Sequence, residues 1–230
     1  MEEKEQLVKS KERVTLHGEV FTAEREVTAM LDLVKDEAER IDSRFLEPAC
    51  GEGNFLVVIL KRKLDVVDKK YGKHLANFEK YSMIALSSIY GVELLDDNAT
   101  CCRERLYSIW NDYYTRKLKN EINKNCQKSA KYILDRNILR GDALTMLNSH
   151  GEPIIFSQWD LIMGNLIKRR DYRLDVLMEN EESNNEDNYQ IDFLEDFDTE
   201  WELQNEKYLK IPKALKEYTP IEYWRVFEHE

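Results

Sequence analysis

The sequence predicts an α/β protein in which a parallel sheet is flanked by helices. From residue 24 to residue 165, segments with helical spacing alternate with short apolar segments typical of strands. This alternation indicates parallel strands joined by crossover helices. A glycine-containing turn joins the first predicted strand to the next helix, and the length of 230 residues is sufficient for one well-buried domain with appendages.

The predicted elements follow in a regular order. Apolar residues recur at helical spacing over 24–40, with Thr22 as the expected N-cap. A short strand at 43–47 then leads through the glycine turn into a helix at 55–64. The later elements are a helix at 75–88, a strand from 88 that ends in acidic residues, a helix at 99–117, and strands at 137–144 and 159–165. The lysine-rich, polar stretch between 117 and 137 is interpreted as a connection.

Composition divides the chain into three parts. Residues 1–173 form the predicted domain, 174–209 an acidic, partly flexible segment with a mobile loop at 179–188, and 210–230 an aromatic segment that docks on the rest. The net charge of −11 is local, because residues 179–206 contain twelve acidic residues and no basic one. Basic stretches occur at 116–131 and 168–173, so contact with nucleic acid is compatible with the composition.

The composition does not indicate a metal centre or a secreted protein. The four cysteines show neither Cys-x-x-Cys spacing nor a clustered histidine, so we expect no metal site and no disulfide framework. No stretch approaches the ~20 apolar residues of a membrane span, and the charged start lacks the apolar core of a signal peptide. We therefore expect a cytoplasmic protein.

The first glycine turn carries the main functional signal. It reads Glu47-Pro48-Ala49-Cys50-Gly51-Glu52-Gly53-Asn54-Phe55. The glycines let the backbone approach a ligand, and the positive end of the following helix dipole favours a carboxylate. This is how α/β proteins hold an adenosine-containing cofactor. The alternatives are an ordinary strand-to-helix turn and, for Cys50, a reactive thiol; no histidine lies near it in sequence, so we expect that side chain to pack.

This turn closely resembles the cofactor loop of the gamma-type adenine-N6 DNA methyltransferases, in which Asp/Glu-Pro-Ala-Cys-Gly-Ser/Asn-Gly-Asn/Gly-Phe is usual. The resemblance implies a Rossmann-like fold that binds S-adenosylmethionine through residues 47–51 and 53–55. Gly18-Glu19-Val20-Phe21-Thr22 is similar to the family's Gly-x-x-Phe-Thr-Pro segment, with Ala23 in place of proline. By that resemblance, Phe21 and Thr22 cover the adenosine and methionine portions of the cofactor.

Two further carboxylates support the interpretation of a cofactor site. Glu93 ends the second predicted strand, where a carboxylate accepts hydrogen bonds from both ribose hydroxyls. A plain solvated turn is the alternative there. Asp142, followed by Ala143, resembles the family residue that accepts from the adenine amino group of the cofactor.

The fourth predicted strand leads into a damaged motif. Residues 159–164 match the lead-in of the family's Asn-Pro-Pro-Tyr tetrapeptide, so Asn165 occupies the catalytic position, but Leu166-Ile167-Lys168 replaces Pro-Pro-Tyr. Methyl transfer to a flipped adenine needs acceptors that orient its amine. Asn165 keeps one acceptor, whereas the rigid prolines and the stacking ring are missing. Nearby Lys168, Arg169 and Arg170 are candidates for phosphate contacts, with a solvated basic turn as the alternative.

The resemblance covers residues 18–170 and implies adenine-N6 methylation of DNA in a restriction-modification system, on a Rossmann-type sheet with a shortened C-terminal half. No target-recognition region is recognisable. One alternative is therefore a degenerate methyltransferase that only binds the cofactor, and another is one subunit of a split enzyme whose partner supplies the missing motifs. Methylation of RNA or protein on the same fold is a third alternative.

Overall fold

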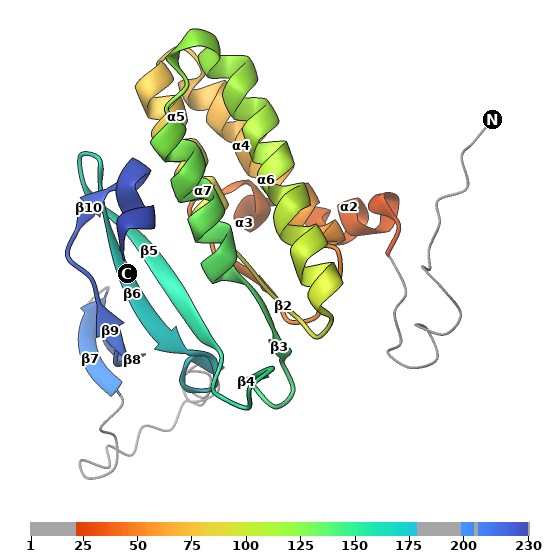
Figure 1. Ribbon diagram of the computed structural model, residues 1–230, viewed down its shortest axis with the longest axis vertical. Helices are drawn as coiled ribbons and strands as arrows, with labels where there is room; N and C mark the ends of the chain where they lie inside the picture. The colour runs from red at the N-terminus through yellow and green to blue at the C-terminus, as the bar shows by residue number, and fades with distance from the viewer. Residues whose placement is uncertain (1–21, 179–198, 205–206, 230) are drawn as a thin grey trace.

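The computed structural model describes residues 22–178, 199–204 and 207–229 (Figure 1). It confirms the predicted α/β class with a partly parallel sheet and flanking helices. Strands β1 (Phe45–Glu47), β2 (Ile89–Glu93) and β3 (Ile138–Asp142) are parallel and lie in that order. The short β4 (Leu147–Asn148) pairs with β3 in the antiparallel direction. The Rossmann-type arrangement remains a prediction, because the described part of this sheet has three parallel strands.

A second sheet contains the segment predicted as the fourth parallel strand. Strand β5 (Ile155–Met163) starts earlier than expected and pairs antiparallel with β6 (Leu166–Arg173). The short strands β9 (Lys216–Glu217) and β10 (Ile221–Glu222) pair with β6 as well. For β5 to run parallel to β3, the connection between them would need about a dozen residues or more, usually including a helix, to bring the chain back to the start of the sheet. Residues 143–154 instead contain β4 and turns, so β5 reverses direction.

The helices form a layer against the parallel strands. Helix α4 (Asn54–Tyr71) and α5 (Leu75–Ser87) pack on each other and on β2, and α6 (Asp96–Leu118) and α7 (Lys124–Asn137) complete the layer (Figure 1). The helix predicted at 24–40 is two helices, α2 (Glu24–Asp32) and α3 (Lys35–Glu39). Thr22 is not the N-cap that we expected, because α2 begins one residue later and Ala23 takes that place without a side-chain bond.

The stretch interpreted as a polar connection contains α7, so that interpretation is wrong. Asn123 caps the helix, because its side chain accepts from the backbone N–H groups of Asn125 and Cys126 at 3.0 and 3.4 Å. Cys126, Ala130, Ile133 and Leu134 are buried at the spacing of one helix face. The many lysines on the opposite face obscured this pattern.

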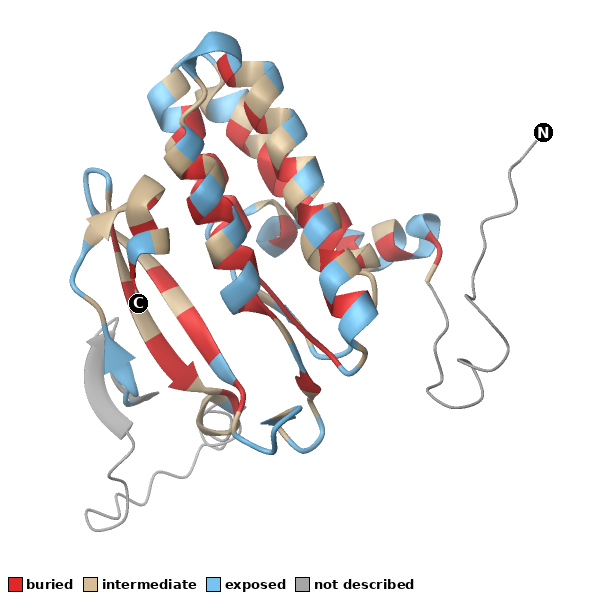
Figure 2. Cartoon of the chain, viewed as in Figure 1, coloured by how far each residue is buried: buried red, intermediate tan, exposed pale blue. Residues whose placement is uncertain are grey.

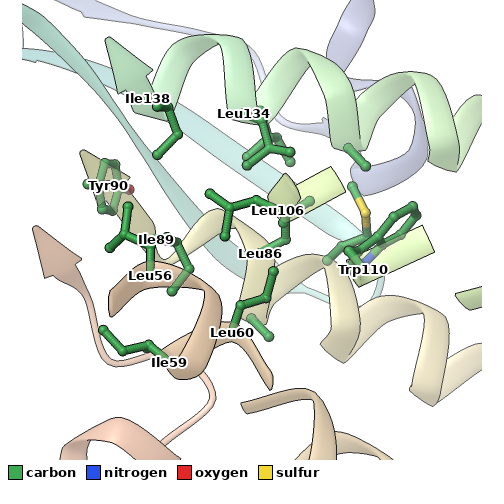
Figure 3. Packing of buried hydrophobic residues seen from close by; sticks show 14 of the residues in the cluster. Leu56, Ile59, Leu60, Leu86, Ile89, Tyr90, Leu106, Trp110, Leu134 and Ile138 are labelled. Carbon is green, nitrogen blue, oxygen red and sulfur yellow. The ribbon is translucent and has the colours of Figure 1, made fainter. Parts of the chain in front are cut away.

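The hydrophobic core fills the space between the helices and the parallel sheet (Figure 3). Leu56 and Leu60 from α4 meet Leu86 from α5 and Leu106 from α6 there. Trp110 stacks on Tyr114 with ring centroids 4.6 Å apart. This packing fixes the helices against β2 and so positions the loops at the ends of the strands.

The C-terminal segment closes over this layer. The 3-10 helix η2 (Tyr223–Glu228) packs against α7, with Tyr223 and Val226 buried. The Tyr223 hydroxyl donates to Glu79 at 2.9 Å, and the Tyr114 hydroxyl donates to the other oxygen of the same carboxylate at 2.5 Å. In the described part of the chain no helix is long and apolar enough to cross a membrane. The mobile loop predicted at 179–188 lies outside the described residues.

Candidate cofactor site

Three carboxylates end the three parallel strands. Glu47, Glu93 and Asp142 are the last residues of β1, β2 and β3. Since the strands are parallel neighbours, their carboxyl ends meet at one edge of the sheet. Open α/β sheets bind their ligands outside this edge. The structure therefore brings the predicted carboxylates together at the edge where a ligand is expected.

Glu93 connects the glycine loop to the start of α6. One oxygen of its buried carboxylate accepts from the backbone N–H of Gly51 at 2.8 Å. The other accepts from the N–H of Leu95 at 2.9 Å and from the side chain of Asn98 at 3.4 Å. A carboxylate has about four lone-pair positions. Glu93 can hold the loop through Gly51 and still accept from a ligand hydroxyl.

The two glycines of the loop have different roles. Both have positive φ, +52° at Gly51 and +81° at Gly53, where side chains are strained. A Cβ on Gly53 would lie 2.5 Å from the sulfur of Cys102, whereas a Cβ on Gly51 would meet nothing within 4 Å. Gly53 therefore allows close packing on α6. Gly51 leaves its backbone beside open space that a ligand can enter.

Hydrogen bonds hold the loop between α2 and α6. The Arg105 side chain donates to the carbonyl of Glu52 at 2.7 Å and to the side-chain oxygen of Asn54 at 2.9 Å. Asn54 in turn donates to the carbonyl of Thr22 at 3.3 Å. The structure thus places the backbone of Thr22 next to the glycine loop, and its role at the cofactor stays a prediction. Phe21 lies outside the described residues.

Burial and, as the smaller cause, the negative charge of Glu93 together raise the pKa of Glu47 to about 8. One Glu47 oxygen, Oε2, is buried and has no hydrogen-bond partner among the described residues. Asp142 differs, because its carboxylate accepts from the N–H of Leu144 at 2.9 Å. Glu47 is consequently a carboxyl group with an unused acceptor at the sheet edge.

The other predicted loop residues are partly available to a ligand. Pro48 and Ala49 are exposed, while Phe55 and Ala143 are half-buried against the core. A hydrogen bond with Cys102 and burial raise the pKa of Cys50 well above its ordinary value. Cys50 is therefore an uncharged thiol that packs, as expected.

Asn165 lies at the opposite end of the sheet from these carboxylates. Ile154, the residue before β5, lies against Gly141 near the end of β3. Further along, Asp160 pairs with Arg44, the residue before β1, at 3.0 Å. Strand β5 therefore runs in the direction opposite to β1, β2 and β3, and the turn between β5 and β6 projects beyond the amino ends of those strands (Figure 1).

The turn that holds Asn165 is fixed by two contacts. Lys80 on α5 donates to the carbonyl of Gly164 at 3.1 Å, and the N–H of Tyr223 donates to the carbonyl of Asn165 at 3.0 Å. In this arrangement Asn165 does not lie at the carboxylate edge of the parallel sheet, and its catalytic role stays a prediction. The reason is the antiparallel hairpin, which carries the motif to the far end of the sheet.

The residues that replace the family's proline pair form the start of β6. Leu166 pairs with Met163 and Glu222, and Ile167 pairs with Leu161 and Ile221. Proline has no N–H to donate and is excluded from the middle of a sheet. Leucine and isoleucine at these two positions thus permit a strand with neighbours on both sides, where two prolines would not.

The basic residues after this motif are occupied within the protein. Arg169 is 3% exposed and its guanidinium binds Asp171 through two hydrogen bonds of 2.8 and 2.7 Å. Lys168 pairs with Glu217 at 2.6 Å and Arg170 with Asp160 at 2.8 Å. The prediction that Arg169 contacts phosphate is wrong, because its side chain is buried in the core of the second sheet. Lys168 and Arg170 are neutralised by ion pairs.

Comparison with known protein families gives an independent result. The family described as MmeI, DNA-methyltransferase domain, matches residues 22–210. The chain belongs to this family. The match spans the glycine loop, Glu93, Asp142 and Asn165, and it supports a DNA methyltransferase of a restriction-modification system. No curated protein and no solved structure was found to match the chain.

Proposed function

We propose that this MmeI-type methyltransferase domain binds S-adenosylmethionine at the carboxyl edge of its parallel sheet and serves adenine-N6 methylation of DNA. The observation that carries the proposal is the Glu93 carboxylate, which binds the backbone of Gly51 at 2.8 Å. It joins a predicted ribose acceptor to a predicted cofactor loop. Methylation at adenine rests on the resemblance of the loop to the gamma-type enzymes.

Two observations test whether the residues fit the cofactor. The backbone of Gly51 faces space in which even a Cβ would touch nothing within 4 Å, and the Glu47 carboxyl has a buried oxygen without a partner. An ammonium group is a suitable partner for that oxygen. Together with the acceptors of Glu93 for the ribose hydroxyls, these features fit a ligand that carries a ribose and an ammonium group. When bound, S-adenosylmethionine supplies the methyl group on its sulfonium.

The residues of this chain then have separate roles in binding. Glu93 accepts hydrogen bonds from the ribose hydroxyls, and Asp142 accepts from the adenine amino group. Glu47 would hold the ammonium of the methionine portion, and that positive charge would lower the pKa of its carboxyl and release its proton to solvent. Gly51 and Thr22 supply backbone close to the ligand. These groups orient the cofactor.

The hairpin position of Asn165 favours a second candidate function. Because Asn165 lies beyond the amino ends of the strands, no described residue from the damaged motif lies at the cofactor edge to hold a target amine. The chain would then be the cofactor-binding subunit of a split methyltransferase, with the target amine held by a partner. A degenerate protein that binds the cofactor without transfer is distinguished from it by activity with that partner.

Calorimetric titration with S-adenosylmethionine tests the first proposal. We expect micromolar binding that is lost in Glu93→Ala and in Gly51→Val, because the first removes the acceptor and the second fills the space beside the loop. Glu104→Ala on the exposed side of α6 is the matched control and should bind normally. Thermal melting must show that each variant is folded, since Glu93 also holds the loop. Absence of binding by folded wild type would overturn the proposal.

A methyl-transfer assay separates the two functions. Wild type is incubated with labelled S-adenosylmethionine and adenine-containing duplex DNA, alone and with the products of neighbouring genes. Transfer by the chain alone supports the complete enzyme, and transfer only with a partner supports the split enzyme. Binding without transfer in either case leaves the cofactor-binding protein.

A further inference from the structure

Helix α7 carries a row of exposed cations on its outer face. Lys124, Lys128 and Lys131 follow one another at spacings of four and three residues, which places them on one side of the helix, and Arg136 follows near its end. Exposed positions recur along α7 in Figure 2. None of these four side chains forms an ion pair with a described carboxylate. We call these four residues the α7 ridge.

Aromatic rings hold the ridge cations without neutralising them. The Lys131 ammonium lies 4.7 Å from the ring centre of Tyr107 on α6, and that of Lys128 lies 5.3 Å from Phe227 on η2. Arg136 lies 5.1 Å from the ring of Tyr132. Such contacts orient a cation and leave its net charge in place. The charges of Lys124 and Lys128 therefore remain available to an external anion, while Lys131 and Arg136 also interact electrostatically with the single carboxylate of Asp135.

The ridge is not explained by the stability of its own helix. Lys124 is the first residue of α7, at the positive end of the helix dipole, where a cation is unfavourable. Asp135 is the one acidic residue of α7, and it pairs with Arg103 on α6 at 3.7 Å. By contrast Lys69 and Lys70 occupy the last turn of α4, where cations are favoured. The four cations of α7 against its single carboxylate make this face positively charged, which indicates a binding surface.

We propose that the α7 ridge binds the phosphate backbone of duplex DNA without reading its sequence. From Lys124 to Arg136 the helix rises about 18 Å, at 1.5 Å per residue. B-DNA carries one charge per ~1.7 Å of its axis when both strands are counted, so about ten phosphates occupy this length and about five of them belong to each strand. The inference rests on the proposed function in DNA methylation, which makes duplex DNA the partner rather than another polyanion.

The place of the ridge in the fold gives it a positioning role. Helix α7 runs directly into β3, which ends at Asp142 on the cofactor edge. The five residues of β3 separate the Arg136 end of the ridge from that edge by roughly 13 Å. The ridge would hold the duplex on the helical layer beside the site of reaction. This surface supplies affinity independent of sequence in a chain whose own basic residues near Asn165 are already paired.

Binding of a fluorescent duplex at several salt concentrations tests the proposal. The variant carries Lys124→Gln, Lys128→Gln and Lys131→Gln. The matched control carries Lys69→Gln, Lys70→Gln and Lys73→Gln, which removes the same charge from exposed positions elsewhere. We expect the ridge variant to weaken binding more than tenfold at low salt. The slope of log K against log salt should fall by about 2 to 3, at roughly 0.9 for each lost phosphate contact.

A failure of the proposed DNA contact can be distinguished from a failure of the proposed function. The ridge variant should lose affinity equally for two duplexes of unrelated sequence, and the control variant should bind like wild type. A variant with arginine at residues 124, 128 and 131 should also bind like wild type. Titration with S-adenosylmethionine should be unchanged in the ridge variant, so a failure of cofactor binding is recognised separately. Equal binding by ridge and control variants, no duplex binding by wild type, or preference for duplex RNA over DNA would each overturn the proposal.

Discussion

The buried carboxyl of Glu47 makes the stability of the protein depend on pH in a defined direction. Burial, followed by the charge of Glu93, raises its pKa from 4.5 to about 8. Between these two values the folded state holds a proton that the unfolded state has lost. The free energy of unfolding should therefore fall as the pH rises through this window. Glu47→Gln keeps the shape of the side chain and removes the titration.

The magnitude follows from the width of the window. Each unit of pH within it costs about 1.4 kcal/mol of stability, so from pH 5.5 to 7.5 wild type should lose roughly 3 kcal/mol relative to Glu47→Gln. That figure is an upper limit, because the Glu47 side chain is half-buried and water can relax around its charge. Below pH 4.5 the two proteins should have parallel pH dependence.

Urea unfolding followed by tryptophan fluorescence measures this difference at several pH values. Because the comparison is between wild type and Glu47→Gln, the titrations of groups that do not interact with Glu47 cancel. The expected result is a difference in unfolding free energy that grows in favour of the variant from pH 5.5 to 7.5 and levels off above about pH 8. Parallel curves across that window would refute the raised pKa and, with it, the description of Glu47 as an uncharged group in the free protein.

Four other predictions follow from the same geometry. Binding of S-adenosylmethionine near pH 7.5 should release protons, seen as a dependence of the calorimetric enthalpy on buffer, and Glu47→Gln should abolish the release. Burial lowers the pKa of Lys63 to about 7, so above pH 7 its amine binds fewer protons in the folded state than in the unfolded state. The free energy of unfolding of wild type, measured with urea, should therefore rise from pH 7 towards 9 relative to that of Lys63→Met. Gly53→Ala should cost about 1 to 3 kcal/mol from strain and contact with Cys102, more than Gly51→Ala, as measured by thermal melting; equal losses would contradict the packing role. Ile167→Pro should destabilise the second sheet by about 3 kcal/mol or more, because it removes a ladder donor at a buried position, and unchanged unfolding would show that β6 is not paired as described.

Most of the parallel sheet and its helices were predictable because their signals are local. Short apolar segments before Glu47, Glu93 and Asp142 each end in a carboxylate, and each is a strand in the structure. The position of these residues at one sheet edge follows from parallel pairing alone. Helix α7 was predictable in principle, since Asn123 and the buried face beginning at Cys126 are visible in the sequence. Its charged face concealed that periodicity.

The course of β5 was not predictable from local signals. Residues 159–165 fit both a central parallel strand and one arm of a hairpin, since an apolar run does not specify its partner. The deciding features are distant in sequence: the buried ion pair of Arg169 and Asp171 in β6, and the pairing of β6 with Ile221. Likewise, the charge of Arg169 indicates a surface residue until its carboxylate partner is known.

The replacement of the proline pair connects the damaged motif to the topology. In Leu166 and Ile167 the chain has two backbone N–H groups that a proline pair lacks, and β6 begins at Leu166 with strand neighbours on both sides. The hairpin then carries Asn165 beyond the amino ends of β1 to β3, where the N–H of Tyr223 and the turn contact of Lys80 hold it. The carboxylates at the other end are unaffected, because β1 to β3 and the glycine loop pack on the helical layer independently of β6. In this arrangement the acceptor position and the candidate cofactor site lie apart, so the proposed cofactor binding and the proposed methyl transfer should be separable by mutation.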